Sequence, residues 1–256
     1  VSRSKSGEYI FIASTSTLSS EYRFLDASDP AGEFIVIEPR RRGHEYEVSA
    51  QGGEFYIRTN LDAVNFRLMK APVEAPSLEN WTELIAHRDE VLLEGVELFD
   101  RYLVLSERRG GLPLIRVIGR GDGGDHHVDF GEETYDVYLS DNYEMDTGLL
   151  RFEYSSLTTP PTTYDYDMAA REKELLKRDE VLGGFDPSDY EAERLYAKAG
   201  DGTLVPISMV YRKGTARDGD NPLLLYGYGS YGYSQDASFR SYRFSLVDRG
   251  FIFAIA

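Results

Sequence analysis

The sequence has no cysteine and only one tryptophan and four histidines among its 256 residues. Without cysteine the chain can form neither disulfides nor thiolate metal sites, which fits a reducing compartment. No apolar run approaches the roughly 18 residues that a membrane-spanning helix needs, and the sequence shows no apolar core of a signal peptide. We therefore expect a cytoplasmic protein that does not contact membranes.

Positive charge is also scarce. The 28 lysines and arginines stand against 44 aspartates and glutamates, which gives a formal net charge of −16 at pH 7. A surface of this sign repels the phosphate backbone, so we do not expect a nucleic acid as a partner. Cationic ligands suit such a surface better.

Aromatic residues are abundant, at 13% of the chain, and they favour β-structure. Alternating segments recur as "EYIFIAS", "EFYIRTN", "RYLVLSE" and "LRFEYSS", each followed by a turn and further strand-like sequence. Their equivalent apolar residues, Tyr9, Phe55, Tyr102 and Leu150, are 46, 47 and 48 residues apart. A period of about 40–50 residues with four strands is typical of β-propeller blades. An ordinary antiparallel sandwich is the alternative that the near-constant spacing disfavours.

The pattern changes near Glu191. Two strands around a glycine turn are expected in 191–213, buried strands in "NPLLLY" and "FIFAIA", and between them a helix with Asp236 as its N-cap and Gly250 past its end. We therefore expect a mostly β chain, with residues 1–190 as the C-terminal portion of a propeller. Residues 191–256 would be the start of an α/β domain. Because the chain ends on a core strand, we expect it to be a piece of a longer protein.

The stretch "LLLYGYGSYG" contains Gly227, Gly229 and Gly232 in the G-x-G-x-x-G spacing of dinucleotide-binding loops. In such loops the helix opens within the glycine motif, so that its N-terminus faces the pyrophosphate. Here helical periodicity begins only after several more residues, which disfavours a nucleotide. The loop instead places tyrosines at the end of a strand, where they either serve a site or simply pack.

The segment "NPLLLYGYGSYGYSQDASFRSYRFSLVDRGFIFAIA" resembles the start of the catalytic domain in the prolyl oligopeptidase family of serine peptidases, in its oligopeptidase B branch. Upstream, "STLSSEYRFLDASDPAGEF", "RFEYSSLTTPPTTYDYDM" and "EVLGGFDPSDYEAERLYA" resemble the propeller of that family and its return to the catalytic domain. The resemblance covers essentially the whole chain. It implies a seven-bladed propeller, of which about four blades are present here, and the first elements of an α/β-hydrolase domain.

The resemblance also implies roles for three residues. Tyr228, the second tyrosine of the Y-G-Y-G motif, would donate its hydroxyl to the oxyanion hole, and Tyr231 would lie near the S1 pocket. Asp236 would bind basic residues of the substrate, although Ser238 stands where the family carries a second acid. The implied activity is hydrolysis of short peptides after Arg or Lys, with no metal or organic cofactor. The partners are basic peptides and the remainder of the same enzyme.

The catalytic triad is absent. No G-x-S-x-G nucleophile motif occurs, and all four histidines lie in the repeat region, so this chain alone should not hydrolyse peptides. The acid- and histidine-rich stretches 121–127 and 140–148 lack metal-binding spacing and are expected to be loops. Two alternatives to cleavage after basic residues stay open: proline-specific cleavage within the same family, and a propeller that binds partners without catalysis.

Overall fold

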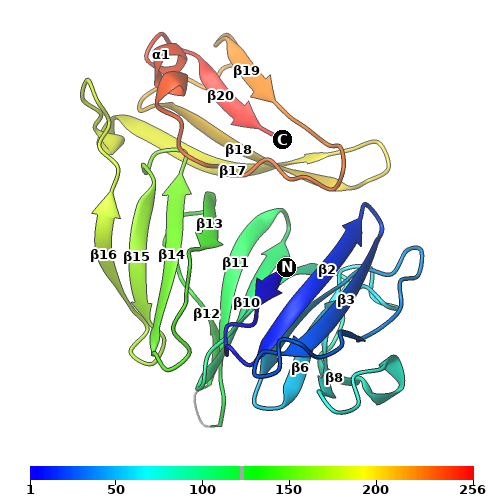
Figure 1. Cartoon of the computed structure of the whole chain (residues 1–256). Coiled ribbons are helices and arrows are strands. Elements are labelled where there is room, and N and C mark those ends of the chain that lie inside the picture. The colour runs from blue at the N-terminus through cyan, green and yellow to red at the C-terminus, as the bar shows by residue number, and fades with distance from the viewer. Residues whose placement is uncertain (122–123) are drawn as a thin grey trace. The chain divides into compact units, whose positions relative to one another are not determined.

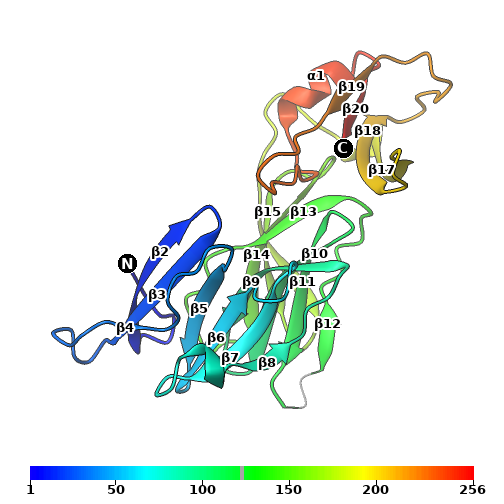
Figure 2. The same cartoon turned by 90° about the vertical axis from the view of Figure 1, so that its right-hand side faces the viewer.

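The computed structural model describes residues 1–121 and 124–256, whose strands form five four-stranded β-sheets (Figure 1). In the first four sheets, consecutive strands of the chain lie side by side and run antiparallel, as alternating apolar segments joined by tight turns require. The first sheet contains β1 (Ser2–Arg3), β2 (Tyr9–Ser16), β3 (Ser19–Asp26) and β4 (Ile35–Val36). The second, seen in Figure 2, contains β5 (Tyr46–Gln51), β6 (Glu54–Thr59), β7 (Arg67–Pro72) and β8 (Thr82–Ile85).

The third and fourth sheets repeat the same order. The third contains β9 (Val91–Leu98), β10 (Tyr102–Arg109), β11 (Leu112–Gly119) and β12 (Asp125–His127). The fourth contains β13 (Tyr135–Leu139), β14 (Leu149–Ser156), β15 (Thr162–Asp167) and β16 (Glu172–Arg178). The four equivalent residues of the sequence repeat all fall in the second strand of their sheet, in β2, β6, β10 and β14. The predicted repeat of four-stranded sheets is therefore confirmed.

The fifth sheet is of a different type. It contains β17 (Tyr190–Lys198), β18 (Leu204–Arg212), β19 (Leu223–Tyr226) and β20 (Ile252–Ile255), in the order β17-β18-β20-β19. β20 pairs antiparallel with β18 and parallel with β19, so the chain must cross over between β19 and β20. The sequence expectation that β19 is buried is wrong, because its four residues are 42–58% exposed. β19 is the edge strand of this sheet, paired on one side only, whereas β20 lies inside it.

The helix expected between these strands is much shorter than its sequence pattern. It consists of a 3₁₀ turn, η3 (Ser241–Arg243), and a single α-helical turn, α1 (Phe244–Val247). Residues 236–240 stay outside the helix, and the residue that precedes η3 is Arg240, so the prediction that Asp236 caps a helix is wrong. The predicted stop is confirmed at Gly250, whose φ of +90° allows Phe251 N to donate to Leu246 O at 3.2 Å.

Two further 3₁₀ turns, η1 (Leu78–Asn80) and η2 (Pro187–Asp189), precede Trp81 and β17. The expectation that residues 121–127 form a loop is wrong for 125–127, which pair with β11 as β12. Residues 122 and 123 of that stretch lie outside the described residues. No helix of the described residues is long and apolar enough to span a membrane.

The chain divides into two compact units. The first comprises Val1–Arg109, Ile115–His127 and Asn142–Gly148, and the second comprises Gly110–Leu114, Val128–Asp141 and Leu149–Ala256. In the first unit Phe55 is fully buried at the centre of an aromatic cluster, with ring centroids 4.8 Å from Phe24 and 5.7 Å from Tyr9. In the second unit Phe244 packs 4.6 Å from Phe185 and from Tyr190. Each unit thus has its own hydrophobic core.

Candidate functional site

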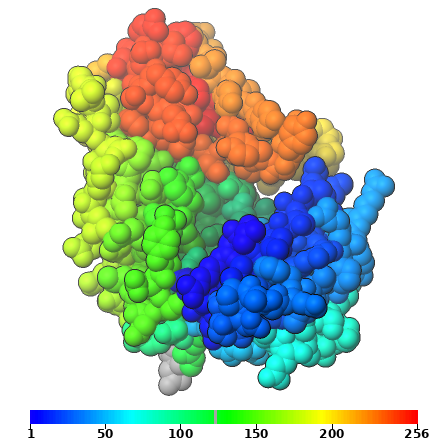
Figure 3. Space-filling view, in the orientation of Figure 1, coloured from blue at the N-terminus to red at the C-terminus, as the bar shows by residue number. Residues whose placement is uncertain are grey.

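The tyrosine-rich loop begins at the carboxyl end of β19, in the second unit. Parallel pairing places Tyr226 beside Ile255, and Ala256 N donates a hydrogen bond to Tyr226 O at 3.0 Å. A Cβ on Gly227 would lie 3.3 Å from Ala256 O, so the close approach of the two chain segments favours glycine there. The carboxyl ends of parallel strands are where α/β proteins place their ligands. The orange segment in Figure 3 shows this loop at the surface of its unit.

Two of the three sequence-predicted site residues line one cavity of about 190 Å³, which is formed within the second unit. Tyr228 is 47% exposed, and its ring packs edge-on against that of Tyr233 with the centroids 6.2 Å apart. Asp236 is half-buried and also lines this cavity. The structure therefore brings a phenol hydroxyl and a carboxylate to one cavity. The hydroxyl can donate a hydrogen bond to a developing oxyanion, and the carboxylate can attract a cation.

Tyr231 does not line this cavity. Its side chain is 93% exposed and its φ is +60°, a left-handed conformation that a tyrosine rarely adopts. Such a backbone costs on the order of 1–3 kcal/mol and persists where its surroundings impose it. Here Gly232 follows with φ +67°, so the two residues together turn the chain sharply.

Ser238, at the position of the missing second acid, has a structural role. Its backbone N donates to Asp236 O at 2.9 Å, and its carbonyl accepts a hydrogen bond of 2.6 Å from Arg243 Nη1. Arg243 is buried beneath it with its guanidinium 4.5 Å from the centroid of the Phe253 ring, and this burial lowers the pKa of Arg243. The backbone of the loop is thus tied to the core of the second unit directly after Asp236.

Sequence reasoning missed another part of the cavity lining. It is formed by Arg194 of β17, by Pro206 and Ser208 of β18, and by Gly111 and Tyr135. Arg194 Nη2 donates to Gly110 O, and Arg194 Nε donates to the hydroxyl of Tyr196 at 3.3 Å. A Cβ on Gly111 would lie 3.0 Å from Pro206 Cγ, so this turn can pack here only without a side chain. No local motif signals the contacts of Arg194 with Gly110 and of Gly111 with Pro206, since each joins residues more than 80 positions apart.

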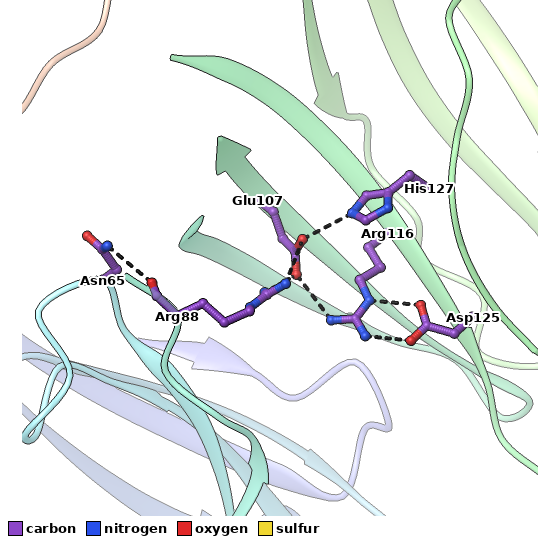
Figure 4. Close-up of polar contacts among 6 residues, drawn as sticks. All are labelled: Asn65, Arg88, Glu107, Arg116, Asp125 and His127. Carbon is purple, nitrogen blue, oxygen red and sulfur yellow. Dashed lines mark hydrogen bonds and ion pairs between the residues drawn. The ribbon is translucent and has the colours of Figure 1, made fainter. Parts of the chain in front are cut away.

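A second polar cluster lies in the first unit, around the carboxylate of Glu107 (Figure 4). Glu107 on β10 is 1% exposed, and it pairs with Arg88, with Arg116 at 3.6 Å and with His127 at 3.3 Å. Arg116 also donates to both oxygens of Asp125, which holds the pKa of that carboxyl below its usual range. Asn65 Nδ2 donates to the carbonyl of Arg88 at 3.2 Å. The cluster therefore joins a loop of the second sheet to three strands of the third.

This cluster is a structural network. Its acids are each held by arginine, and no group of three or more His, Asp or Glu side chains within residues 1–121 and 124–256 could hold a metal ion. The G-x-G-x-x-G loop has no helix at its glycines either, because the first helical residue after Gly232 is Ser241. The cavity beside Tyr228 and Asp236 is therefore the best candidate site in the described part of the chain.

The N-terminal β-propeller domain of prolyl oligopeptidase, as a family model, matches residues 1–179. The chain belongs to the prolyl oligopeptidase family. The match ends before β17, where the order of strands changes from consecutive to mixed.

Members of the family align along the whole chain. Dipeptidyl aminopeptidase BI of Pseudoxanthomonas mexicana is 44% identical over 258 residues, which cover 100% of this chain and 35% of that protein. Protease 2 of Moraxella lacunata is 33% identical over 256 residues, covering 100% of this chain and 36% of that protein. The structure of oligopeptidase B from Trypanosoma brucei with covalently bound antipain matches with a TM-score of 0.91 at 36% identity, covering 100% of this chain and 38% of that one. The chain thus spans about a third of the length of these relatives.

Proposed function

We propose that this chain is part of a serine oligopeptidase that hydrolyses short peptides after arginine or lysine. Residues 1–190 would belong to its propeller and residues 191–256 would begin its α/β-hydrolase domain. The observation that carries the proposal is the shared cavity of Tyr228 and Asp236 at the carboxyl end of the parallel strands β19 and β20. Similarity to oligopeptidase B of Trypanosoma brucei supports the same function.

In this proposal Tyr228 stabilises the transition state. Its hydroxyl donates a hydrogen bond to the oxyanion that forms when the nucleophile attacks the peptide carbonyl. Removal of one such donor typically costs about 10²–10³ in kcat. Packing against Tyr233 holds the ring in place before substrate binds, which lowers the reorganisation that the step requires.

Asp236 and Tyr231 would bind the substrate. The Asp236 carboxylate attracts an arginine or lysine side chain, and the exposed Tyr231 ring offers a π-face on which such a cation can rest. The net charge of −16 favours approach of basic peptides over acidic ones. Because Ser238 replaces the second acid of the family pattern, we expect a weaker preference for a second basic residue in the substrate.

The remaining catalytic groups would come from the rest of the enzyme. The chain has no nucleophile motif, so the serine, the aspartate and the histidine must be supplied by polypeptide outside it, and the chain alone should be inactive. A propeller beside the site would admit peptides and exclude folded proteins. Residues of this chain then contribute binding and oxyanion stabilisation but not bond formation.

The test uses the full-length polypeptide that contains this chain, with the 256-residue chain as control. We expect a serine-reactive fluorophosphonate probe to label the full-length protein and not the control. N-blocked Arg-Arg nitroanilide should be hydrolysed much faster than N-blocked Gly-Pro nitroanilide. Faster release from the proline reporter would establish the proline-specific alternative. If the folded full-length protein were not labelled, the remaining interpretation would be a propeller that binds partners without catalysis.

Release of dipeptides from the amino terminus is a second candidate, because the relative that is 44% identical is named a dipeptidyl aminopeptidase. Such an enzyme must bind a free α-amino group, and Asp236 is the one carboxylate side chain on the cavity wall among the described residues. Arg-Arg nitroanilide with a free amino group and its N-blocked form separate the two functions. Dipeptide release requires the free amine, whereas an oligopeptidase accepts both forms.

A further inference from the structure

A lysine of the first unit occupies a small cation-binding arrangement that the proposed mechanism does not use. Lys5 Nζ lies 2.5 Å from Glu97 Oε1 and 3.7 Å from the centroid of the Phe99 ring. A carboxylate on one side and a π-face on the other are what a lysine or arginine side chain of a ligand would require. The ion pair is partly buried, with the Lys5 and Glu97 side chains 18% and 27% exposed.

Space lies beside this ion pair. A cavity of about 130 Å³ is lined by Ser2–Lys5, by Val48–Ala50 of β5 and by Val96–Leu98 of β9. Ser2 and Ser49 bring hydroxyl groups to its lining next to the apolar Phe11, whereas the Ser4 hydroxyl already accepts a hydrogen bond from Tyr9 N at 3.0 Å. At this volume the cavity can take a single basic side chain that reaches Glu97, while the rest of the peptide lies outside it.

The adjacent residues carry an unused acceptor and a further acid. Gln51, directly after Ala50 of the cavity wall, has its Oε1 buried with no hydrogen-bond partner among the described residues. Its Nε2 donates to Asp100 Oδ1 at 3.0 Å, so this amide is held in place by an acid that follows Phe99. A buried acceptor without a donor is costly, but Gln51 does not line the cavity, so only a ligand that extends past Ala50 would reach it.

The backbone around Lys5 is held in a turn, since Ser4 N donates to Tyr9 O and Gly7 N donates to Ser4 O, both at 2.8 Å, so the site opens by movement of the Lys5 side chain. The preceding strand, β1, pairs with β2 through Ser2–Phe11 and Arg3–Ile10. Figure 3 shows the N-terminal residues, in dark blue, at the surface of the first unit. Turning the Lys5 side chain away breaks its ion pair with Glu97 and its contact with the Phe99 ring, and it uncovers that ring, which is otherwise fully buried.

We propose that Glu97 and Phe99 form an accessory docking site for a basic side chain of a peptide, which Lys5 occupies until a peptide displaces it. The inference rests on the proposed function, since it takes a basic peptide as the ligand. Lys5 then acts as an internal competitor. Its removal should strengthen peptide binding, and loss of the Glu97 charge should weaken it.

The experiment measures binding rather than cleavage. The probe is a fluorescein-labelled tetrapeptide of D-lysine, which the peptidase should not cleave, and the readout is fluorescence anisotropy. It is titrated into the full-length protein carrying Asp236→Asn, so that the candidate active site does not compete for the probe. In this background Lys5→Met and Glu97→Gln are compared with Glu83→Gln, which removes the acid of an exposed ion pair with Arg67 of the second sheet.

We expect Lys5→Met to tighten binding about fivefold, because the apparent Kd equals the intrinsic Kd divided by the open fraction, and the Lys5–Glu97 pair keeps the site mostly closed. Glu97→Gln should weaken binding at least as much, and Glu83→Gln should leave it unchanged. Since loss of any positive charge favours a polycationic probe, the gain must exceed that of Lys70→Met, which removes the cation of the exposed Lys70–Glu54 pair. With this control Lys5→Met decides the matter even if Glu97→Gln is unstable. Unchanged or weaker binding in Lys5→Met overturns the docking site. A full-length Asp236 protein that fails to cleave N-blocked Arg-Arg nitroanilide refutes the proposed function separately.

Discussion

Replacing Glu107 by glutamine removes the negative charge at the centre of the network in the first unit. Its two arginine partners then remain in place, with side chains that are 33% and 19% exposed for Arg88 and Arg116. Breaking a buried ion pair by removing one partner costs about 3–5 kcal/mol, since the other charge stays desolvated. Because Arg88 can recover part of its hydration, we expect the free energy of unfolding to fall by the lower value, about 3 kcal/mol.

The assay is a urea titration followed by the fluorescence of Trp81, the only tryptophan of the chain. Trp81 is 8% exposed and packs in the core of the first unit, so its emission should report unfolding there. Glu47→Gln is the matched control, because Glu47 pairs with Arg58 while 57% exposed, and such surface pairs contribute about 0–1 kcal/mol. Equal losses in the two variants would refute the reasoning that burial makes the Glu107 network strong.

Three further predictions concern single residues. Tyr228→Phe in the full-length enzyme should lower kcat by about 10²–10³ and preserve the fold, and an unchanged kcat would remove Tyr228 from the oxyanion hole. Gly111→Ala should lower the urea midpoint more than Gly110→Ala. Both glycines have positive φ, but only at position 111 would the added Cβ press against Pro206. Equal shifts of the midpoint would contradict the close approach of Gly111 and Pro206. Burial lowers the pKa of His44, so its stabilising contribution is full above the ordinary value of 6.5 and declines as the pH falls below it. His44→Gln should flatten that part of the pH dependence of the urea midpoint, and an unaltered slope would assign it to other groups.

The repeated sheets could be predicted because their signal is local. Tyr9, Phe55, Tyr102 and Leu150 each begin or lie near the start of the second strand of a sheet, and alternation with tight turns suffices to place them. The length of the helix before β20 could not be predicted in this way. Phe239 and Phe244 pack with Phe185 of a distant segment, and Phe239 N reaches Ser155 Oγ at 3.3 Å, so tertiary contacts keep the first residues of the helical pattern extended.

The residues of the candidate site likewise fall into those that could be predicted from sequence and those that could not. The glycine-tyrosine loop is continuous in sequence, so the tyrosines and Asp236 could be identified from their motif and their resemblance to the family. Arg194, Ser208 and Gly111 reach the cavity from other parts of the chain through packing and backbone hydrogen bonds. Exposure of β19 was also unpredictable, because an apolar run indicates a strand but not whether another element covers it.

The order of strands has a consequence for synthesis on the ribosome. Each of the first four sheets is built from neighbouring segments, so it can form as soon as its fourth strand has emerged. In the fifth sheet β20 separates β18 from β19, so β19 has no partner until some 26 further residues, Gly227–Ile252, have been made and the first residue of β20 arrives. During that interval three consecutive leucines, Leu223–Leu225, lie unpaired, and the nascent chain is most exposed to aggregation at the strand that carries the tyrosine loop.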